Sequence, residues 1–149
     1  MGNFLKLGVS IGDPNGIGLE IILKAFSHQN TLSDFIPIVY SNLEIIEFHL
    51  AHLKLDLEIN VIKSISESLK GKLNVFEISS SNFKVDFGKS NIQSGDIAFR
   101  SLSTATKHII ENKIDCLVTA PIDKNTIQSK NFEFNGHTEY LTKISNKNN

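Results

Sequence analysis

Two short segments of the sequence carry side chains suited to holding an anionic small molecule. Residues 119–124 end in Lys124, whose ammonium group can bind a phosphate or a carboxylate as a point charge. His137 and Thr138 are adjacent, and a histidine beside a helix N-terminus tends to stay neutral, ready to donate or accept a hydrogen bond. The Thr138 hydroxyl could also contact a ligand. The alternatives are a solvated lysine at position 124 and a helix cap with an exposed histidine at 137–138.

A glycine-rich stretch at residues 11–18 is a third candidate. Its glycines at positions 12, 16 and 18 do not fit the G-x-G-x-x-G pattern of dinucleotide-binding loops, and it lacks the Gly-Lys-Ser/Thr of a P-loop. Asp13 and Glu20 flank the expected start of a helix, where they would repel a bound phosphate. These acids suit a cation, an amine or a hydroxyl better. The alternative is a tight turn that lets the helix pack close to its strand.

The elements that must position these segments follow from the hydrophobic periodicity. Short apolar runs predict five strands, and apolar residues three and four apart predict helices, one of them directly after the glycine-rich stretch. Ser41 and Glu44 have the spacing of a capping box. Residues 79–94 are expected to form a loop, with at most a short strand at 83–85. The predicted strands span residues 5–11, 36–40, 59–62, 73–78 and 114–118, and the other predicted helices span 41–53, 96–112, 122–129 and about 138–145.

This alternation of strands and helices predicts an α/β fold with a mostly parallel sheet and flanking helices. Residues 1–149 contain no linker long enough to divide them, so we expect a single α/β region. The carboxyl ends of parallel strands meet at one edge of the sheet, which is where α/β enzymes bind their ligands. We therefore expect Asp13, Lys124 and His137 to line one cavity at that edge.

Composition excludes several classes of function. The 149 residues include 16 acids and 15 Lys and Arg, for a net charge of −1, which lacks the basic footprint of a nucleic-acid binder. No apolar run reaches the length of a membrane span, and residues 1–10 lack the features of a signal peptide. A single cysteine, Cys116, cannot form an internal disulfide and is expected to pack in a strand. We expect a soluble cytoplasmic protein without nucleic-acid or membrane partners.

The remaining histidines are weaker candidates. His49 and His52 lie three apart on one helical face, a spacing that metal pairs also use, but no third ligand is evident and a solvated face is the simpler interpretation. His28 and His108 lie near expected helix ends, where they would interact with terminal carbonyl groups.

The three segments together resemble a known family. Residues 11–20, 119–124 and 134–141 are similar, in order and spacing, to the motifs of the PdxA family of 4-hydroxythreonine-4-phosphate dehydrogenases, and residues 88–112 also follow the family pattern. The resemblance spans essentially the whole chain, which corresponds to the N-terminal half or less of a family member. It implies a truncated form of the fold of isocitrate and isopropylmalate dehydrogenases. It also implies a homodimer whose active site lies in the cleft between two α/β domains.

The resemblance implies an activity and cofactors. Members use NAD or NADP to oxidise the C3 hydroxyl of 4-phosphooxy-L-threonine, and the β-keto acid loses CO2 to give 3-amino-2-oxopropyl phosphate for pyridoxal phosphate biosynthesis. His137 and Thr138 match the substrate-binding pair, and Asp13 and Lys124 are expected to line the site, whereas the resemblance assigns no catalytic residue. The family's divalent metal (zinc, magnesium or cobalt) is bound by three histidines downstream of its His-Thr pair. Those histidines and the main cofactor-binding segments are expected beyond Asn149, so this chain should hold no metal ligand.

Departures from the family pattern leave alternatives open. Asn15 stands where the family usually has Ala, Leu19 where it has Pro, and Asp123 where it has Asn. We expect the 149 residues to be inactive alone. One alternative is a paralogous dehydrogenase for erythronate or threonate 4-phosphate. Another is a non-catalytic α/β module that binds a phosphorylated metabolite or a partner chain.

Overall fold

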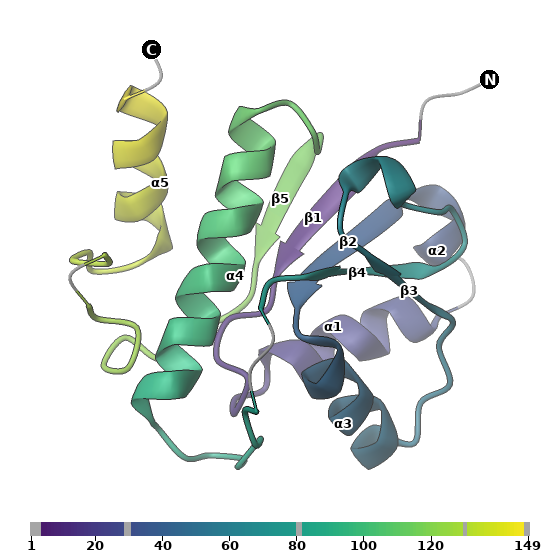
Figure 1. The fold of residues 1–149 in the computed structure, drawn as a ribbon, viewed down its shortest axis with the longest axis horizontal. Coiled ribbons are helices and arrows are strands. Elements are labelled where there is room, and N and C mark those ends of the chain that lie inside the picture. Colours follow the sequence, from purple (N-terminus) through teal and green to yellow (C-terminus); the bar gives the residue numbers. More distant parts are fainter. Residues whose placement is uncertain (1–3, 29–30, 80–81, 130, 148–149) are drawn as a thin grey trace.

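A single parallel sheet forms the centre of the molecule. The computed structural model describes residues 4–28, 31–79, 82–129 and 131–147. Within these residues, five strands pair in the order β3-β4-β2-β1-β5, and every pairing is parallel (Figure 1). The predicted α/β class is confirmed. The strands are β1 (Lys6–Ser10), β2 (Ile36–Ser41), β3 (Ile59–Ile62), β4 (Leu73–Glu77) and β5 (Cys116–Thr119).

Helices cover both faces of this sheet. Side chains of α1 and α3 pack against one face, and those of α4 pack against the other. The helix α5 lies beside α4, away from the sheet (Figure 1). None of the helices among the described residues is both long and apolar enough to cross a membrane. The helical elements are α1 (Gly18–Ser27), α2 (Thr31–Asp34), α3 (Leu43–Leu53), the 3-10 turn η1 (Ile65–Glu67), α4 (Ile92–Ile110) and α5 (His137–Lys147).

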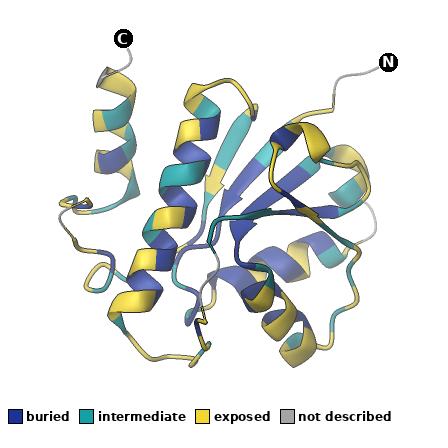
Figure 2. Ribbon diagram, viewed as in Figure 1, coloured by how far each residue is buried: buried dark blue, intermediate teal, exposed yellow. Residues whose placement is uncertain are grey.

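The central strand β2 shows how the two layers are built. Successive side chains of a strand point to opposite faces, so Val39 packs in the layer of α1 and α3, whereas Ile38 and Tyr40 pack in the layer of α4. All three are fully buried, as expected for a strand of a parallel sheet covered on both sides (Figure 2). The continuous apolar run at this position in the sequence therefore reflects burial on two faces.

The predicted helix over residues 122–129 is wrong. Residues 124–126 form a single turn, in which the Asp123 side chain accepts a hydrogen bond from the backbone N–H of Asn125 at 2.9 Å and its carbonyl accepts the Thr126 hydroxyl at 3.3 Å and the Ile127 N–H at 3.1 Å. The turn does not continue into a helix. Ile127 is buried in a cluster with Phe132 and with residues of α4 and α5.

Two helix starts differ from the prediction. The first residue of α4 is Ile92, because the Asn91 side chain accepts a hydrogen bond from the backbone N–H of Ser94 at 2.7 Å and so caps the helix. The helix predicted at 41–53 is present as α3, but it begins at Leu43 and the predicted capping box does not form. Its first N–H, that of Leu43, donates to the Glu77 carboxylate of β4 at 3.1 Å. No strand forms at 83–85.

Candidate functional site

The glycine-rich loop and the loop after β5 lie in contact at the carboxyl edge of the sheet. Ser10 is in register with Thr119, so both loops leave the sheet at the same level. The backbone N–H of Asp13 donates to the carbonyl oxygen of Pro121 at 3.0 Å. Gly12 has a positive φ of 66°, and a Cβ there would lie 2.0 Å from the same carbonyl oxygen. A residue without a side chain is therefore required at position 12 for the two loops to meet.

Asp13 and Asp123 form an acidic part of this loop pair. Partial burial raises the pKa of the Asp13 carboxyl, a hydrogen bond from the Asn15 N–H lowers it, and the charge of Asp123 raises it again. The exposed Asp123 carboxylate accepts a hydrogen bond from the Ser90 hydroxyl, which with the Asn125 N–H lowers the pKa of Asp123. The arrangement keeps Asp123 ionised and favours a proton, an amine or another donor near Asp13.

Asn15 is a structural residue that the sequence did not single out for this role. Its side chain is 2% exposed. The side chain accepts a hydrogen bond from the N–H of Asp86 at 2.9 Å and donates one to the carbonyl of Lys89 at 2.8 Å. The backbone carbonyl of Asn15 accepts a hydrogen bond from the N–H of Gly88. The departure from the family's usual Ala was visible in the sequence, but nothing there indicated partners more than 70 residues away. Asn15 thus joins the glycine-rich loop to the segment before α4.

A cleft of about 520 Å³ brings together Lys124, His137 and Thr138. Lys124 and Thr138 are exposed, and His137 is half-buried at the first position of α5. The Nε2 atom of His137 is buried and has no hydrogen-bond partner among the described residues. Burial lowers the pKa of the His137 imidazole, so it is neutral near pH 7. The cleft is therefore lined by a fixed positive charge, a hydroxyl and a neutral imidazole.

Asp13 lies next to this cleft but is not among the residues that line it. The structure thus places Lys124 and His137 on one cleft, as expected, whereas Asp13 lies outside it and contacts the Pro121 carbonyl group. Pro121 connects the two parts, because it lines the cleft and its carbonyl accepts the Asp13 N–H. The expected three-residue cavity is replaced by a two-part arrangement of loop and cleft.

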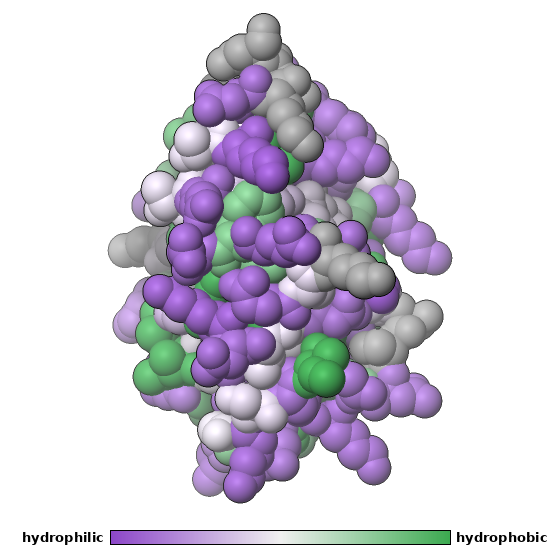
Figure 3. Space-filling view, turned by 90° about the vertical axis from the view of Figure 1, so that its left-hand side faces the viewer, coloured by the Kyte–Doolittle hydropathy of each residue, from purple (hydrophilic) through white to green (hydrophobic). Residues whose placement is uncertain are grey.

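The surface around the cleft is polar. The face of the molecule that carries α5 is mostly hydrophilic, with small separate hydrophobic patches (Figure 3). Beneath that surface, Tyr140 of α5 packs on Phe99 of α4 and on Phe132, which fixes the helix that begins with His137. The packing of Tyr140 on these aromatic rings thus positions the first turn of α5, which carries His137 and Thr138.

Two predictions about other histidines are wrong. His49 is 1% exposed, and its Nδ1–H donates to the Ile45 carbonyl at 2.8 Å. Of the two histidines on this helix, His52 is exposed and His49 is buried. His108 does not bind terminal carbonyl groups and instead pairs through Nδ1 with the Tyr40 hydroxyl at 2.9 Å. Both imidazoles pack in the protein interior because aromatic rings, Phe87 and Phe76, lie against them.

The resemblance implies a divalent metal and a nicotinamide cofactor. The described residues contain no group of three or more His, Cys, Asp or Glu side chains placed to hold a metal ion. In the glycine-rich loop, the space that side chains at Gly12 and Gly18 would occupy is filled by Ala120 and Pro121. These glycines serve contact between loops and do not open a cradle for a cofactor.

Comparison with known proteins decides the family. The sequence model described as "Pyridoxal phosphate biosynthetic protein PdxA" matches residues 33–149. The chain belongs to the PdxA family. A PdxA-family relative from Bacteroides thetaiotaomicron, named 4-hydroxythreonine-4-phosphate dehydrogenase, is 37% identical over 139 residues, covering 93% of this chain and 38% of that protein. A D-threonate 4-phosphate dehydrogenase from Cupriavidus necator is 28% identical, covering 93% and 42%. The relatives are dehydrogenases by name.

Solved structures of 4-hydroxythreonine-4-phosphate dehydrogenases share the fold of this chain. A 4-hydroxythreonine-4-phosphate dehydrogenase from Burkholderia phymatum superposes with a TM-score of 0.88 at 23% identity, over 97% of this chain and 44% of that one. The Klebsiella pneumoniae enzyme of the same name gives 0.79 at 26% identity, over 95% and 45%. The chain thus spans about two fifths of the length of its curated relatives, which bears out the expectation of a truncated dehydrogenase fold.

Proposed function

We propose that this chain supplies the substrate-binding side of a PdxA-type dehydrogenase that acts on 4-phosphooxy-L-threonine. The observation that carries the proposal is the cleft shared by Lys124, His137 and Thr138. Lys124 would neutralise an anionic group of the substrate, a role suited to a compact ammonium charge. The carboxyl edge of a parallel sheet is where such sites lie in α/β proteins.

His137 and Thr138 would orient the hydroxyl that is oxidised. The neutral imidazole can accept or donate one hydrogen bond, and the Thr138 hydroxyl can do the same, so the pair can hold a secondary alcohol in one direction. That both residues line the same cleft supports this role. Asp13, whose N–H bonds to the Pro121 carbonyl beside the cleft, would face the amino group of the substrate.

NAD or NADP would accept the hydride and a divalent metal would polarise the reacting oxygen in the complete enzyme. The described residues hold no metal-ligand group and the glycine-rich loop opens no cofactor cradle, so we assign both groups to the part of the family's length that this chain does not span. The 149 residues alone are accordingly expected to bind substrate and not to turn it over. A complete enzyme would act as a homodimer in the pathway to pyridoxal phosphate.

Calorimetric titration of the 149-residue chain with 4-phosphooxy-L-threonine tests the proposal. We expect saturable binding that Lys124→Gln weakens at least tenfold, because the substitution removes the charge and keeps the length of the side chain. Lys84→Gln, at an exposed position outside the cleft, is the matched control. Equal affinities of the two variants would overturn the assignment of Lys124.

A threonate 4-phosphate dehydrogenase is the second candidate, because several relatives carry that name. The two substrates differ in an amino group against a hydroxyl. Titration of the same chain with D-threonate 4-phosphate separates them. A tighter complex with the amino substrate, lost in Asp13→Asn, favours the first candidate, whereas a tighter complex with threonate 4-phosphate favours the second.

A further inference from the structure

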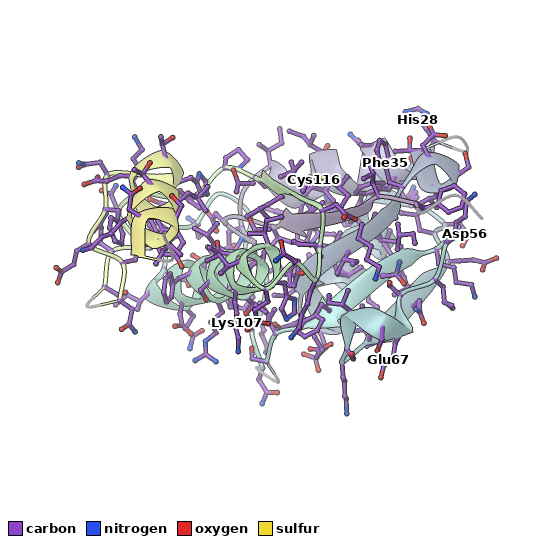
Figure 4. The ribbon with its side chains drawn as sticks, turned by 90° about the horizontal axis from the view of Figure 1, so that it is seen from above. His28, Phe35, Asp56, Glu67, Lys107 and Cys116 are labelled. Atoms are coloured by element: carbon purple, nitrogen blue, oxygen red, sulfur yellow. The ribbon has the colours of Figure 1, made fainter. Side chains whose placement is uncertain are left out.

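A second polar cleft lies on the α4 side of the sheet, between η1 and the last turn of α4. Its volume is about 360 Å³. Lys6 at the start of β1 and Lys113 before β5 both line the cleft, which therefore lies at the amino ends of these two strands. Seen from above, Lys107 of α4 and Glu67 of η1 lie on the same side of the sheet (Figure 4). The polar lining includes Lys6, Lys63, Lys113, Ser64, Ser66 and His108, and none of its lining residues is acidic.

Two of the three ammonium groups of this second cleft are unpaired. Among the described residues, the ammonium groups of Lys6 and Lys63 form no ion pair, although Lys113 pairs with Glu111 at 2.7 Å. The Oε2 atom of nearby Glu67 accepts hydrogen bonds from the backbone N–H groups of Lys63 and Ser64, at 2.8 and 3.3 Å. A chain with a net charge of −1 thus concentrates three cations around one hollow.

Asp115, the other nearby acid, accepts a hydrogen bond from the Lys6 backbone N–H at 2.7 Å. Like Glu67, it is not among the residues that line the cleft. An anion entering the cleft would meet ammonium groups and hydroxyls and no competing carboxylate on its wall.

His108 adds a buried donor to the wall. It is 7% exposed, and its Nδ1 lies 2.9 Å from the hydroxyl of the fully buried Tyr40. Burial raises the pKa of Tyr40, so the phenol keeps its proton, and burial together with Lys113 lowers the pKa of His108, so the ring is neutral. A buried hydroxyl needs an acceptor, and Nδ1 is the only partner of this hydroxyl among the described residues. The ring proton therefore resides on Nε2, which has no partner among these residues.

We propose that this second cleft is a binding site for a small phosphate dianion, either free or as the phosphate of a metabolite. The ammonium groups of Lys6, Lys63 and Lys113 would balance its charge. Ser64 and Ser66 share one hydrogen bond at 2.8 Å, so one of their two hydroxyl protons stays available to the ligand. The site is separate from the cleft at Lys124, because the two clefts lie at opposite ends of β1 and β5.

Nuclear magnetic resonance titration of the 149-residue chain with inorganic phosphate tests the site. The ionic strength is held constant with sodium chloride, since exposed charges respond to salt alone. We expect the amide signals of residues 63–66 and 113 to move along saturable curves. The double variant Lys63→Gln/Lys113→Gln should weaken the affinity at least tenfold. The double variant Lys63→Arg/Lys113→Arg, which keeps the charge, should retain most of it.

Two controls separate this site from the rest of the molecule. Lys84→Gln removes a lysine outside both clefts, and Lys124→Gln removes the lysine of the candidate active site; neither should change the curves at residues 63–66. A parallel titration with sn-glycerol 3-phosphate distinguishes the ligand source, because tighter binding of the ester indicates a metabolite and tighter binding of phosphate indicates the free ion. Linear shifts that sodium chloride reproduces, or an unchanged affinity in the glutamine double variant, would overturn the proposal.

Discussion

The two sides of the candidate active site are built in opposite ways. The glycine-rich loop is mostly buried, and its backbone is fixed by Gly12 against Pro121 and by the Asn15 side chain. The cleft beside it presents exposed Lys124 and Thr138 on turns and on the first turn of α5. The difference indicates that the loop maintains the fold, whereas the cleft is available for a ligand. Substitutions in the loop should therefore cost stability, and those in the cleft should cost binding.

Gly12→Ala should give the largest effect. The added Cβ would collide with the Pro121 carbonyl in a left-handed backbone conformation, so we expect a loss of at least about 3 kcal/mol in the free energy of unfolding. Gly88→Ala is the matched control, because its φ is 74° but nothing lies within 4 Å of the new Cβ; it should cost about 1–2 kcal/mol. Urea unfolding followed by circular dichroism measures both. Equal costs would show that loop contact is not the reason for the glycine.

Asn15→Ala should give the next largest effect. It leaves the Asp86 N–H and the Lys89 carbonyl without their partner, and we expect a cost of about 2 kcal/mol. Asn125→Ala, at an exposed asparagine on the neighbouring loop, should stay within about 0.5 kcal/mol of the unsubstituted chain. If Asn15→Ala is equally harmless in the same unfolding assay, the loop is fixed without this side chain.

Stability should fall as the pH is lowered from 7.5 to 5.5. Burial lowers the pKa of His49, His108 and His137 in the folded state, so below about pH 6.5 the unfolded chain takes up protons first. The stabilisation is complete above the unfolded pKa and is lost as the pH falls toward the folded one. His49→Gln should reduce the slope of unfolding free energy against pH, and His52→Gln, at an exposed position of the same helix, should leave it unchanged. A slope equal in all three proteins would contradict the role of buried His49.

Lys124→Gln should give the smallest effect on stability. Its side chain is exposed and forms no ion pair among the described residues, so the free energy of unfolding should change by less than about 0.5 kcal/mol. Thermal unfolding of this variant beside Lys84→Gln measures the difference. A large loss in the free energy of unfolding would show that Lys124 stabilises the fold and is not free to bind a ligand.

Much of the fold could be predicted because its pattern is local. The apolar runs of β2, β3 and β4 and the spacing within α3 are recorded in neighbouring residues, and the order of strands and helices then indicates a parallel sheet. The short segment at 122–129 misled the prediction because it forms a single turn that is not continued, and the burial of Ile127 against Phe132 is a tertiary contact that periodicity does not report.

The candidate site was less predictable because it depends on distant contacts. The motifs indicated Lys124, His137 and Thr138, and the structure places all three on one cleft. Asp13 is separated from that cleft because its N–H donates to the Pro121 carbonyl. The spacing of residues in the sequence does not predict this contact. The burial of His49 depends likewise on Phe87, 38 residues away, and the pairing of His108 on Tyr40 of another element.

The central claim is that Lys124, His137 and Thr138 receive one ligand together. Nuclear magnetic resonance titration of the 149-residue chain with 4-phosphooxy-L-threonine, read at the His137 ring and the amides of Lys124 and Thr138, tests it most directly. The account predicts that all three signals follow one saturation curve and that Lys124→Gln shifts this curve to higher ligand concentration at the other two. Signals that move independently, or that stay still while the ligand binds elsewhere, would contradict it.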